Sequence, residues 1–351
     1  MKRPKDFWRT LEAFPGAAAV SIEWKVRCGV DYGAAQSFLR PNGKLALSYP
    51  CTIPRGCGCQ HDVITHATDD IVAVCRCERG CETFPLQQSD VVIYELDRPA
   101  LGAALVNLLG LFNGTDTETD LHGTTCIGVY SPYAGYRFPV YLTIQIEPSD
   151  FNEIVDGLLV RNNTPFVLLA PTRDLCTAKA EKLLIDKGSV FVPLSENVIL
   201  GDKRELRLLR PLDEILAQFL ATNLPSPKED GSKVFFPTPP DATWRDVSIK
   251  FIDGHTVSIT VKSVGGVYNY IQMGMVDRRN SGPTQQWKLL RAFSERCGNM
   301  TWDHPAADLG NIKRRERLAA KLSAFFRIEG EPFRLTHDRK GWQARFSISP
   351  R

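Results

Sequence analysis

In the middle of this chain, hydrophobic residues recur with two different periods. Segments with the strand period alternate with segments with the helix period, and this order predicts the positions of the strands and helices. Four short apolar runs are typical of buried strands, and three stretches with apolar residues at every third and fourth position are typical of helices. The expected strands lie at 127–130, 140–144, 166–169 and 190–194, and the expected helices lie at 150–160, 174–186 and 212–220. This order predicts a small, partly parallel sheet in an α/β domain spanning 113–224.

Different patterns flank this domain on either side. Residues 1–112 combine a cysteine-rich segment with a strand expected at 91–94 and a helix expected at 101–111. Residues 225–243 contain five prolines, which interrupt both helices and sheets because proline lacks an amide hydrogen. We therefore expect a Pro-rich linker at 225–243 between the first two domains and a third domain at 244–351.

The third domain begins with alternating runs on either side of Asp253 and Gly254, which predict a β-hairpin. Trp287, Leu290 and Phe293 share one face of a helix that ends at Gly298, and Cys297 is expected on the same face. Further strands are expected at 267–272, 300–302, 333–335 and 342–348, and further helices are expected near 305 and at 311–326.

The expected helix at 311–326 has two unlike sides. Its apolar stripe consists of Leu318, Ala319, Leu322, Phe325 and Phe326. Its opposite side carries Lys313, Arg314, Arg317 and Lys321. The apolar side fixes such a helix to its domain, and the cationic side can reach DNA phosphates and guanine edges in the major groove. The hairpin that follows has Arg339 and Lys340 at its tip.

The net charge of +3 is unevenly distributed along the chain. Residues 244–351 carry 19 Lys and Arg against 10 Asp and Glu, so the remainder of the chain is net acidic. A basic domain attached to an acidic region predicts a polyanionic partner for the basic end.

Three motifs at this end resemble the winged helix-turn-helix effector domain of bacterial two-component response regulators. They are WKLLRAF, IKRRERLAAKLSAFF and GWQARF, and the resemblance covers about residues 244–351. It implies that the helix from Asn311 enters the major groove, and that Arg339 and Lys340 contact the DNA backbone or the minor groove. The chain departs from that family because no acidic receiver-type pocket is evident upstream and because its segment 302–310 is short.

Six of the ten cysteines lie within 31 residues. In a compartment that keeps thiols reduced, such clustering indicates a metal site. The candidate ligands are Cys51, Cys57, Cys59, His61, Cys75, Cys77 and Cys81. If 62–65 and 71–74 form a hairpin, Cys59 and His61 lie opposite Cys77 and Cys75, and these four can converge on a tetrahedral zinc ion. The other three are then surplus or replace His61, or all seven hold two zinc ions with bridging thiolates.

The segment resembles a cysteine-rich zinc-binding module, and a site filled by protein ligands is structural rather than catalytic. An iron–sulfur cluster and unliganded or redox-active thiols are the alternatives. We expect the isolated Cys28, Cys126, Cys176 and Cys297 to be small buried side chains.

The sequence contains no phosphate-binding loop, dinucleotide fingerprint, nucleophile elbow or metalloprotease helix, so we expect a binding protein rather than an enzyme. A weaker ligand site is Thr172, Arg173 and Asp174, because α/β sheets bind ligands at the carboxyl ends of their parallel strands. The simpler interpretation is that Thr172 or Asp174 caps the next helix.

These patterns predict a DNA-binding regulatory protein in which the α/β domain senses a ligand or forms a homodimer. A second hypothesis is a docking subunit of a prokaryotic defence or repair complex that also binds a protein partner. A third is an enzyme that acts on nucleic acid through an unrecognised site. No signal peptide and no apolar run long enough to span a bilayer is visible, so we expect a cytoplasmic protein without a membrane partner.

Overall fold

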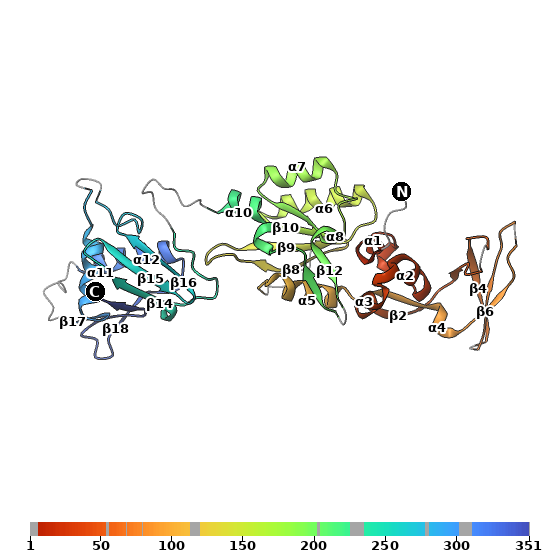
Figure 1. The fold of residues 1–351 in the computed structure, drawn as a ribbon, viewed down its shortest axis with the longest axis horizontal. Coiled ribbons are helices and arrows are strands. Elements are labelled where there is room, and N and C mark those ends of the chain that lie inside the picture. Colours follow the sequence, from red (N-terminus) through yellow and green to blue (C-terminus); the bar gives the residue numbers. More distant parts are fainter. Residues whose placement is uncertain are drawn as a thin grey trace. The chain divides into compact units, whose positions relative to one another are not determined.

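The computed structural model describes residues 6–53, 56–67, 69–78, 80–112, 120–201, 204–224, 235–277, 281–301 and 311–350. These residues form a mixed α/β protein with several separate sheets (Figure 1). The chain divides into two compact units. The first unit comprises Met1–Tyr130 and Phe138–Leu224, and the second comprises Ser131–Arg137 and Pro225–Arg351.

The first unit begins with short helices packed on a three-stranded sheet. The helices are α1 (Phe7–Leu11), α2 (Ser21–Cys28) and α3 (Tyr32–Ala35). The strands, in spatial order, are β1 (Ala18–Val20), β7 (Val92–Leu96) and β2 (Leu39–Leu45). Trp24 of α2 is fully buried, and its indole N–H donates a hydrogen bond to the carbonyl of Tyr94. This bond attaches α2 to the central strand β7.

A four-stranded antiparallel sheet follows, in the spatial order β3–β4–β5–β6. Its strands are β3 (Ser48–Pro50), β4 (Gln60–Ala67), β5 (Asp70–Val74) and β6 (Phe84–Leu86). Asp62 lies opposite Val74, which confirms the hairpin expected between 62–65 and 71–74.

The α/β region contains a sheet in the order β11–β10–β9–β8, in which β9, β10 and β11 are parallel and β8 is antiparallel. The strands are β8 (Thr124–Tyr130), β9 (Phe138–Thr143), β10 (Val167–Ala170) and β11 (Val190–Pro193). The helices α6 (Pro148–Arg161) and α7 (Ala178–Asp186) connect the parallel strands. The expected small, partly parallel sheet is therefore confirmed.

Shorter elements complete the first unit. They are α4 (Gln88–Val91), α5 (Arg98–Leu109), α8 (Leu194–Asn197), β12 (Val198–Leu200), β13 (Leu206–Leu208), α9 (Leu212–Ile215) and α10 (Ala217–Asn223). The single helix expected at 212–220 is thus two helices. The expected cap of α7 was also wrong, because Thr177 Oγ1 accepts the hydrogen bond from Ala180 N. Neither Thr172 nor Asp174 caps this helix.

The second unit contains two sheets, in the orders β16–β15–β14–β20 and β17–β19–β18. Its strands are β14 (Val247–Phe251), β15 (Thr256–Val261), β16 (Val264–Asn269), β17 (Asn299–Thr301), β18 (Phe333–Leu335), β19 (Gly341–Ala344) and β20 (Ser347–Ser349). Its helices are α11 (Gln285–Glu295) and α12 (Asn311–Phe326). The helix expected near 305 lies outside the described residues, as do 225–234 of the expected linker.

The final strand expected at 342–348 is two strands that belong to different sheets. β19 pairs with β17 and β18, whereas β20 runs parallel to β14 with Ile348 opposite Ile249. Between them, Phe346 is buried, and Arg345 N donates a hydrogen bond to the carbonyl of Pro332. This change of partner joins the two sheets at the end of the chain.

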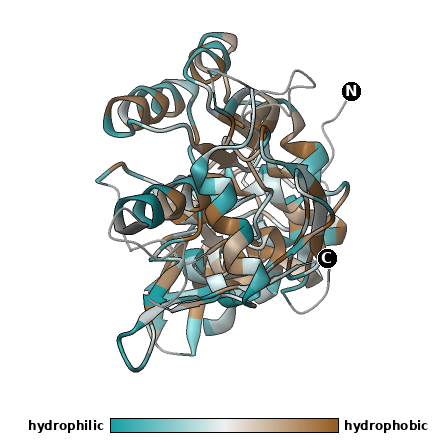
Figure 2. Ribbon diagram, turned by 90° about the vertical axis from the view of Figure 1, so that its left-hand side faces the viewer, coloured by the Kyte–Doolittle hydropathy of each residue, from teal (hydrophilic) through white to brown (hydrophobic). Residues whose placement is uncertain are grey.

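One hydrophobic core lies between these sheets and helices. Leu290 and Phe293 of α11 and Leu322 and Phe326 of α12 are fully buried in it. The helices of the protein carry both hydrophobic and hydrophilic residues, as amphipathic helices do (Figure 2). The core therefore fixes which side of α12 remains in contact with solvent.

The segment Ser131–Arg137, between β8 and β9 in the sequence, also belongs to the second unit. The guanidinium of Arg327 lies 4.2 Å from the ring centroid of Tyr136 and 4.2 Å from that of Phe235. Ala134 N donates a hydrogen bond of 2.9 Å to the carbonyl of Thr238, which belongs to the same unit. A cation placed on two aromatic rings holds the segment in place.

Gly341 permits the close pairing of β17 with β19. A Cβ atom at this position would collide with the carbonyl oxygen of Met300 and would lie 2.8 Å from Thr301 Cα. Both are backbone atoms, which cannot rotate away. We expect Gly341→Ala to lower the free energy of unfolding by about 1–3 kcal/mol, measured by denaturant titration of the full chain.

Gly265→Ala is the matched control. Gly265 is exposed in β16, and a Cβ atom there would meet nothing closer than the Ile259 carbonyl oxygen at 3.6 Å. We expect this change to alter the free energy of unfolding by less than about 0.5 kcal/mol. Equal stability of the two variants would contradict the close pairing of β17 with β19.

Candidate metal centre and basic surface

Six cysteines and one histidine gather at one edge of the β3–β4–β5–β6 sheet. The antiparallel order places the ends of β3 and β5 beside the beginnings of β4 and β6. Cys51 follows β3, Cys57 and Cys59 precede β4, His61 is the second residue of β4, Cys75 and Cys77 follow β5, and Cys81 precedes β6.

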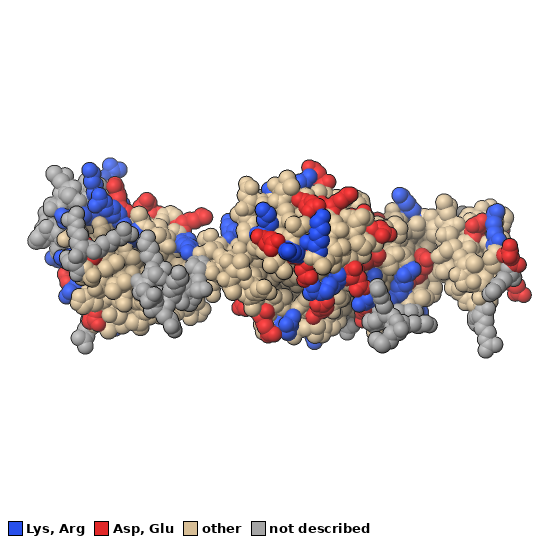
Figure 3. Space-filling model, turned by 90° about the horizontal axis from the view of Figure 1, so that it is seen from above, with Lys and Arg blue, Asp and Glu red and all other residues tan. Residues whose placement is uncertain are grey.

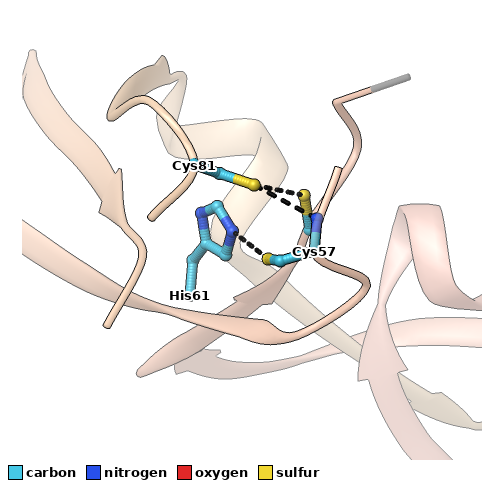
Figure 4. Close-up of side chains that lie close together, drawn as sticks. Cys57, His61 and Cys81 are labelled. Carbon is cyan, nitrogen blue, oxygen red and sulfur yellow. Dashed lines mark hydrogen bonds between the residues drawn. The ribbon is translucent and has the colours of Figure 1, made fainter. Parts of the chain in front are cut away.

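Cys51, Cys57, His61 and Cys81 each place one ligand atom within 4.8 Å of the others. Cys51 Sγ lies 3.9 Å from Cys81 Sγ, and Cys57 Sγ lies 3.5 Å from His61 Nε2. The side chains of Cys57, His61 and Cys81 point toward one another in Figure 4. Sulfur and imidazole nitrogen are atoms that bind zinc and other thiophilic metals, so this group can hold a metal ion.

A second group consists of Cys57, Cys75 and Cys77, whose sulfur atoms also lie within 4.8 Å of one another. Cys57 Sγ lies 3.6 Å from Cys75 Sγ, which lies 3.1 Å from Cys77 Sγ. Cys59 is exposed beside this group, and its amide donates a hydrogen bond of 3.4 Å to Cys57 Sγ. Cys57 therefore belongs to both groups.

His61 is fully buried against the ring of Phe84, with 5.3 Å between the ring centroids. Its Nε2 is near Cys57, and its Nδ1 has no hydrogen-bond partner in the described part of the chain. Burying a polar atom without a partner costs free energy, and a metal ion bound at Nε2 would leave the proton on Nδ1 without supplying that partner. The hairpin register indicated that His61 converges with Cys75, but the structure groups it with Cys51, Cys57 and Cys81.

The close thiols shift one another's ionisation. A backbone hydrogen bond from Cys81, together with hydrogen bonds from Cys77, lowers the pKa of the Cys75 thiol to about 7. A backbone hydrogen bond from Cys59 lowers the pKa of Cys57, but burial and the neighbouring thiols raise it to well above its usual value. Neighbouring anionic sulfurs disfavour one another, so a cation is needed for all of them to ionise together.

Two glycines shape the loop before β4. Gly58 has a φ of 69°, in the left-handed region that favours glycine. A Cβ atom at Gly56 would lie 2.6 Å from Cys51 Sγ and 2.8 Å from the Ile53 carbonyl oxygen. Cys51 N closes the loop by donating a hydrogen bond of 3.0 Å to the carbonyl of Cys59. The small residue at position 56 therefore leaves room for the sulfur of Cys51.

The isolated cysteines have different environments. Cys28 is buried as expected, and burial raises its pKa to about 11. Cys126 and Cys176 are half-buried, and Cys297 is exposed, so the expectation for Cys297 was wrong. The reason is that α11 ends at Glu295 and Cys297 has a φ of 47°, which takes it off the helical face of Trp287.

The cationic side chains expected on α12 lie on its solvent-facing side. Lys313, Arg314 and Arg317 are exposed, and Lys321 is half-buried. Arg339 and Lys340 are exposed in the turn between β18 and β19. Figure 3 shows a group of Lys and Arg side chains at the upper left of the second unit. The structure thus places a basic helix side and a basic hairpin tip on the same unit.

Arg315 has a structural role that the sequence reasoning missed. Its guanidinium lies 5.4 Å from the ring centroid of Trp342, and its side chain is only 18% exposed. The signal was its spacing of three and seven residues from Leu318 and Leu322, because residues at such spacings share a helix face. Arg315 therefore connects α12 to β19.

Residues 172–174 attach the loop after β10 to other elements of the first unit. Thr172 donates hydrogen bonds to the Glu12 carboxylate from its amide, at 3.0 Å, and from its hydroxyl, at 2.5 Å. Asp174 forms an ion pair of 2.8 Å with Arg9. Arg173 forms ion pairs with Glu181 and Glu196. These contacts hold the loop against α1 and α7.

A cavity of about 450 Å³ lies beside this loop. Its lining includes Arg9 and Arg27 together with Asp6, Glu12 and Asp174. Its lining therefore carries both cations and carboxylates, and this mixture indicates no single class of ligand.

Comparison of the chain with protein-family models, with curated proteins and with solved structures found no match. In the described part of the chain, no helix combines the length and the apolar composition needed to cross a bilayer.

We expect Gly56→Ala to lower the metal content of the purified protein, because the added methyl group would displace the sulfur of Cys51. The measurement is elemental analysis of the full chain after gel filtration. Gly33→Ala is the control, since a Cβ atom at Gly33 meets nothing within 4 Å. Full metal content in the Gly56 variant would show that Cys51 is not a ligand.

Burial raises the pKa of Glu12, although the hydrogen bonds from Thr172 oppose this. When the pKa of an acid is raised by folding, its protonated form stabilises the fold. This stabilisation by Glu12 is lost as the pH rises through the pKa that Glu12 has in the folded protein. The side chain in the Glu12→Gln variant cannot ionise. We therefore expect its free energy of unfolding to change less than that of the parent protein when the pH rises from about 4 to about 8. Denaturant unfolding across this range measures the difference.

Glu153→Gln, a change at an exposed position of α6, is the control and should leave the pH profile of the parent protein unaltered. Parallel profiles for the parent protein and the Glu12 variant would contradict the effect of burial on Glu12.

Proposed function

We propose that the second unit is a winged helix that binds double-stranded DNA, with α12 as its recognition helix and the β18–β19 hairpin as its wing. The observation that carries this proposal is the exposed set Lys313, Arg314 and Arg317 on a helix whose opposite side is buried. Arg339 and Lys340 at the hairpin tip add a second cationic element. Both elements suit a surface that follows the phosphates of a duplex.

The order of the elements supports the same proposal. α11, β17, α12, β18 and β19 follow one another in the sequence, and β17 pairs with β19. α12 has 16 residues, so it is about 24 Å long, and the major groove is about 12 Å wide, which admits one helix. Packing of Leu318, Leu322 and Phe326 into the core orients the basic side outward.

The distribution of charge also supports DNA as the polyanion. Residues 244–351 carry 19 Lys and Arg against 10 Asp and Glu, whereas the rest of the chain carries 24 against 30. Basic side chains displace the counterions of a duplex when they bind it, and the release of these ions favours binding at low salt.

The metal in the first unit is zinc in this proposal, and its role is structural. The cluster offers only sulfur and nitrogen ligands, and protein side chains can fill every tetrahedral position. The β3–β6 sheet also has short strands and packs with a small core that includes Ile71, Ala73 and Leu86. A module with so little buried apolar surface needs an additional cross-link to be stable.

We expect the double change Lys313→Ala and Arg317→Ala to weaken DNA binding, because it removes two contacts to phosphates or bases. The slope of log K against log salt concentration should fall by about 2, since each phosphate contact contributes about 0.9. Fluorescence anisotropy with a labelled duplex, repeated at several salt concentrations, measures both quantities on the full chain.

Lys250→Ala is the matched control, because Lys250 is exposed on β14 rather than on α12. It should bind the duplex as the parent protein does. An unchanged salt slope in the double variant, with the fold intact, would rule out α12 as the recognition helix. Selection from a random duplex library then distinguishes a regulator, which prefers one sequence, from a docking subunit, which prefers none.

A further inference from the structure

The two groups of ligands in the cysteine cluster have one member in common. Cys51, Cys57, His61 and Cys81 form the first group, and Cys57 joins Cys75 and Cys77 in the second. A thiolate sulfur has several lone pairs and can bind two metal ions at once. Because Cys57 belongs to both groups, the two groups can form one cluster that holds two metal ions.

The number of cysteine and histidine donors requires sharing if these side chains alone fill both groups. Two separate tetrahedral zinc ions need eight donors in total, whereas this edge of the sheet offers six cysteines and His61. His66 cannot supply the eighth donor, because it is exposed on β4 five residues beyond His61, about 17 Å along the strand. Seven donors fill two tetrahedra when one of them is shared.

The distances agree with this division. Zn–S bonds of about 2.3 Å and Zn–N bonds of about 2.0 Å place two sulfurs of a tetrahedron about 3.8 Å apart and a sulfur and a nitrogen about 3.5 Å apart. Cys57 Sγ lies 3.5 Å from His61 Nε2 in the first group and 3.6 Å from Cys75 Sγ in the second. The 3.9 Å between Cys51 Sγ and Cys81 Sγ also fits one ion.

We propose that the cysteine cluster is a binuclear zinc site in which the thiolate of Cys57 bridges the two ions. Cys51, His61 and Cys81 complete the coordination of the first ion. Cys59, Cys75 and Cys77 complete that of the second. This inference rests on the proposed zinc site and adds its number of ions and the shared ligand.

Cys59 is the fourth ligand of the second ion because of its position in the loop. Its amide contacts Cys57 Sγ at 3.4 Å, and its thiol contacts the carbonyl of Cys57 at 3.7 Å. Its sulfur lies outside the group formed by Cys57, Cys75 and Cys77, so binding the ion requires this exposed side chain to change its rotamer. Cys75 and Cys77, whose sulfurs lie 3.1 Å apart, must separate by about 0.7 Å to bind one ion at tetrahedral positions.

The arrangement also assigns a task to Gly58. This residue separates Cys57 from Cys59, and its φ of 69° turns the chain between them. The turn allows two cysteines only two residues apart to bind the same ion while Cys57 also reaches the first ion. A C-x-C spacing with glycine in the middle suits such a bridge.

The test is the substitution of cadmium-113 for zinc in the full chain. Native mass spectrometry should find two cadmium ions per chain, and NMR should find two cadmium resonances. The β-protons of Cys57 should show scalar coupling to both resonances, whereas those of Cys51 and Cys77 should each couple to one. Coupling of Cys57 to a single resonance would overturn the bridge.

Variants separate the two halves. Cys77→Ser should lower the zinc content from two ions per chain to one, and Cys57→Ser should disturb both ions. Cys297→Ser is the control, because Cys297 is exposed in the second unit and should leave two ions bound. If a variant does not fold, the cadmium spectrum of the parent protein still decides the question.

The outcomes distinguish this inference from the proposed function. A parent protein that binds no zinc contradicts the structural zinc site as a whole. A parent protein that binds one ion, or two ions without a shared ligand, contradicts the bridge and leaves a zinc site in place.

Discussion

Antiparallel pairing of β3, β4, β5 and β6 brings alternate strand ends to one edge of the sheet, and this constraint decides where every candidate metal ligand lies. Between Cys51 and Cys81 the chain returns to this edge several times, and at least one cysteine lies next to each strand end there. All the candidate ligands except His61 therefore lie in the connections that join β3 to β4 and β5 to β6. In return, ligands bound to a common ion would hold four short strands in register, which their small apolar core does weakly.

The second unit follows a different principle, since its order comes from a continuous hydrophobic core. Aromatic side chains of α12 contact the segment before β14, where Phe236 lies 5.5 Å from Phe326 and 6.2 Å from Phe325 between ring centroids. Arg315 on Trp342 fixes the same helix to the hairpin. Such support would matter if α12 is the recognition helix that we propose, because side chains read base edges only when the backbone holds them at a constant depth.

Elements with a clear period could be predicted from the sequence. The positions of α12, the β14–β15 hairpin and the parallel strands followed from apolar spacing, because burial imposes that spacing locally, although the strand ends differ by one or two residues. The helical segments before residue 40 carry no such regular signal. The loop at Thr172 could not be interpreted correctly, because its hydroxyl binds Glu12, which lies 160 residues away in the sequence. The grouping of His61 with Cys51 rather than with Cys75 likewise depends on how side chains turn at the sheet edge, which strand register alone leaves open.

The position of Ser131–Arg137 in the second unit has a consequence for how this protein can be divided into fragments. The polypeptide enters that unit at residue 131, leaves it after 137 and enters it again at 225. The unit therefore consists of two separate segments of the sequence. A fragment starting at residue 225 would lack Tyr136, one of the two rings on Arg327. The second unit therefore cannot be taken from this protein as one continuous segment without losing part of what holds it together.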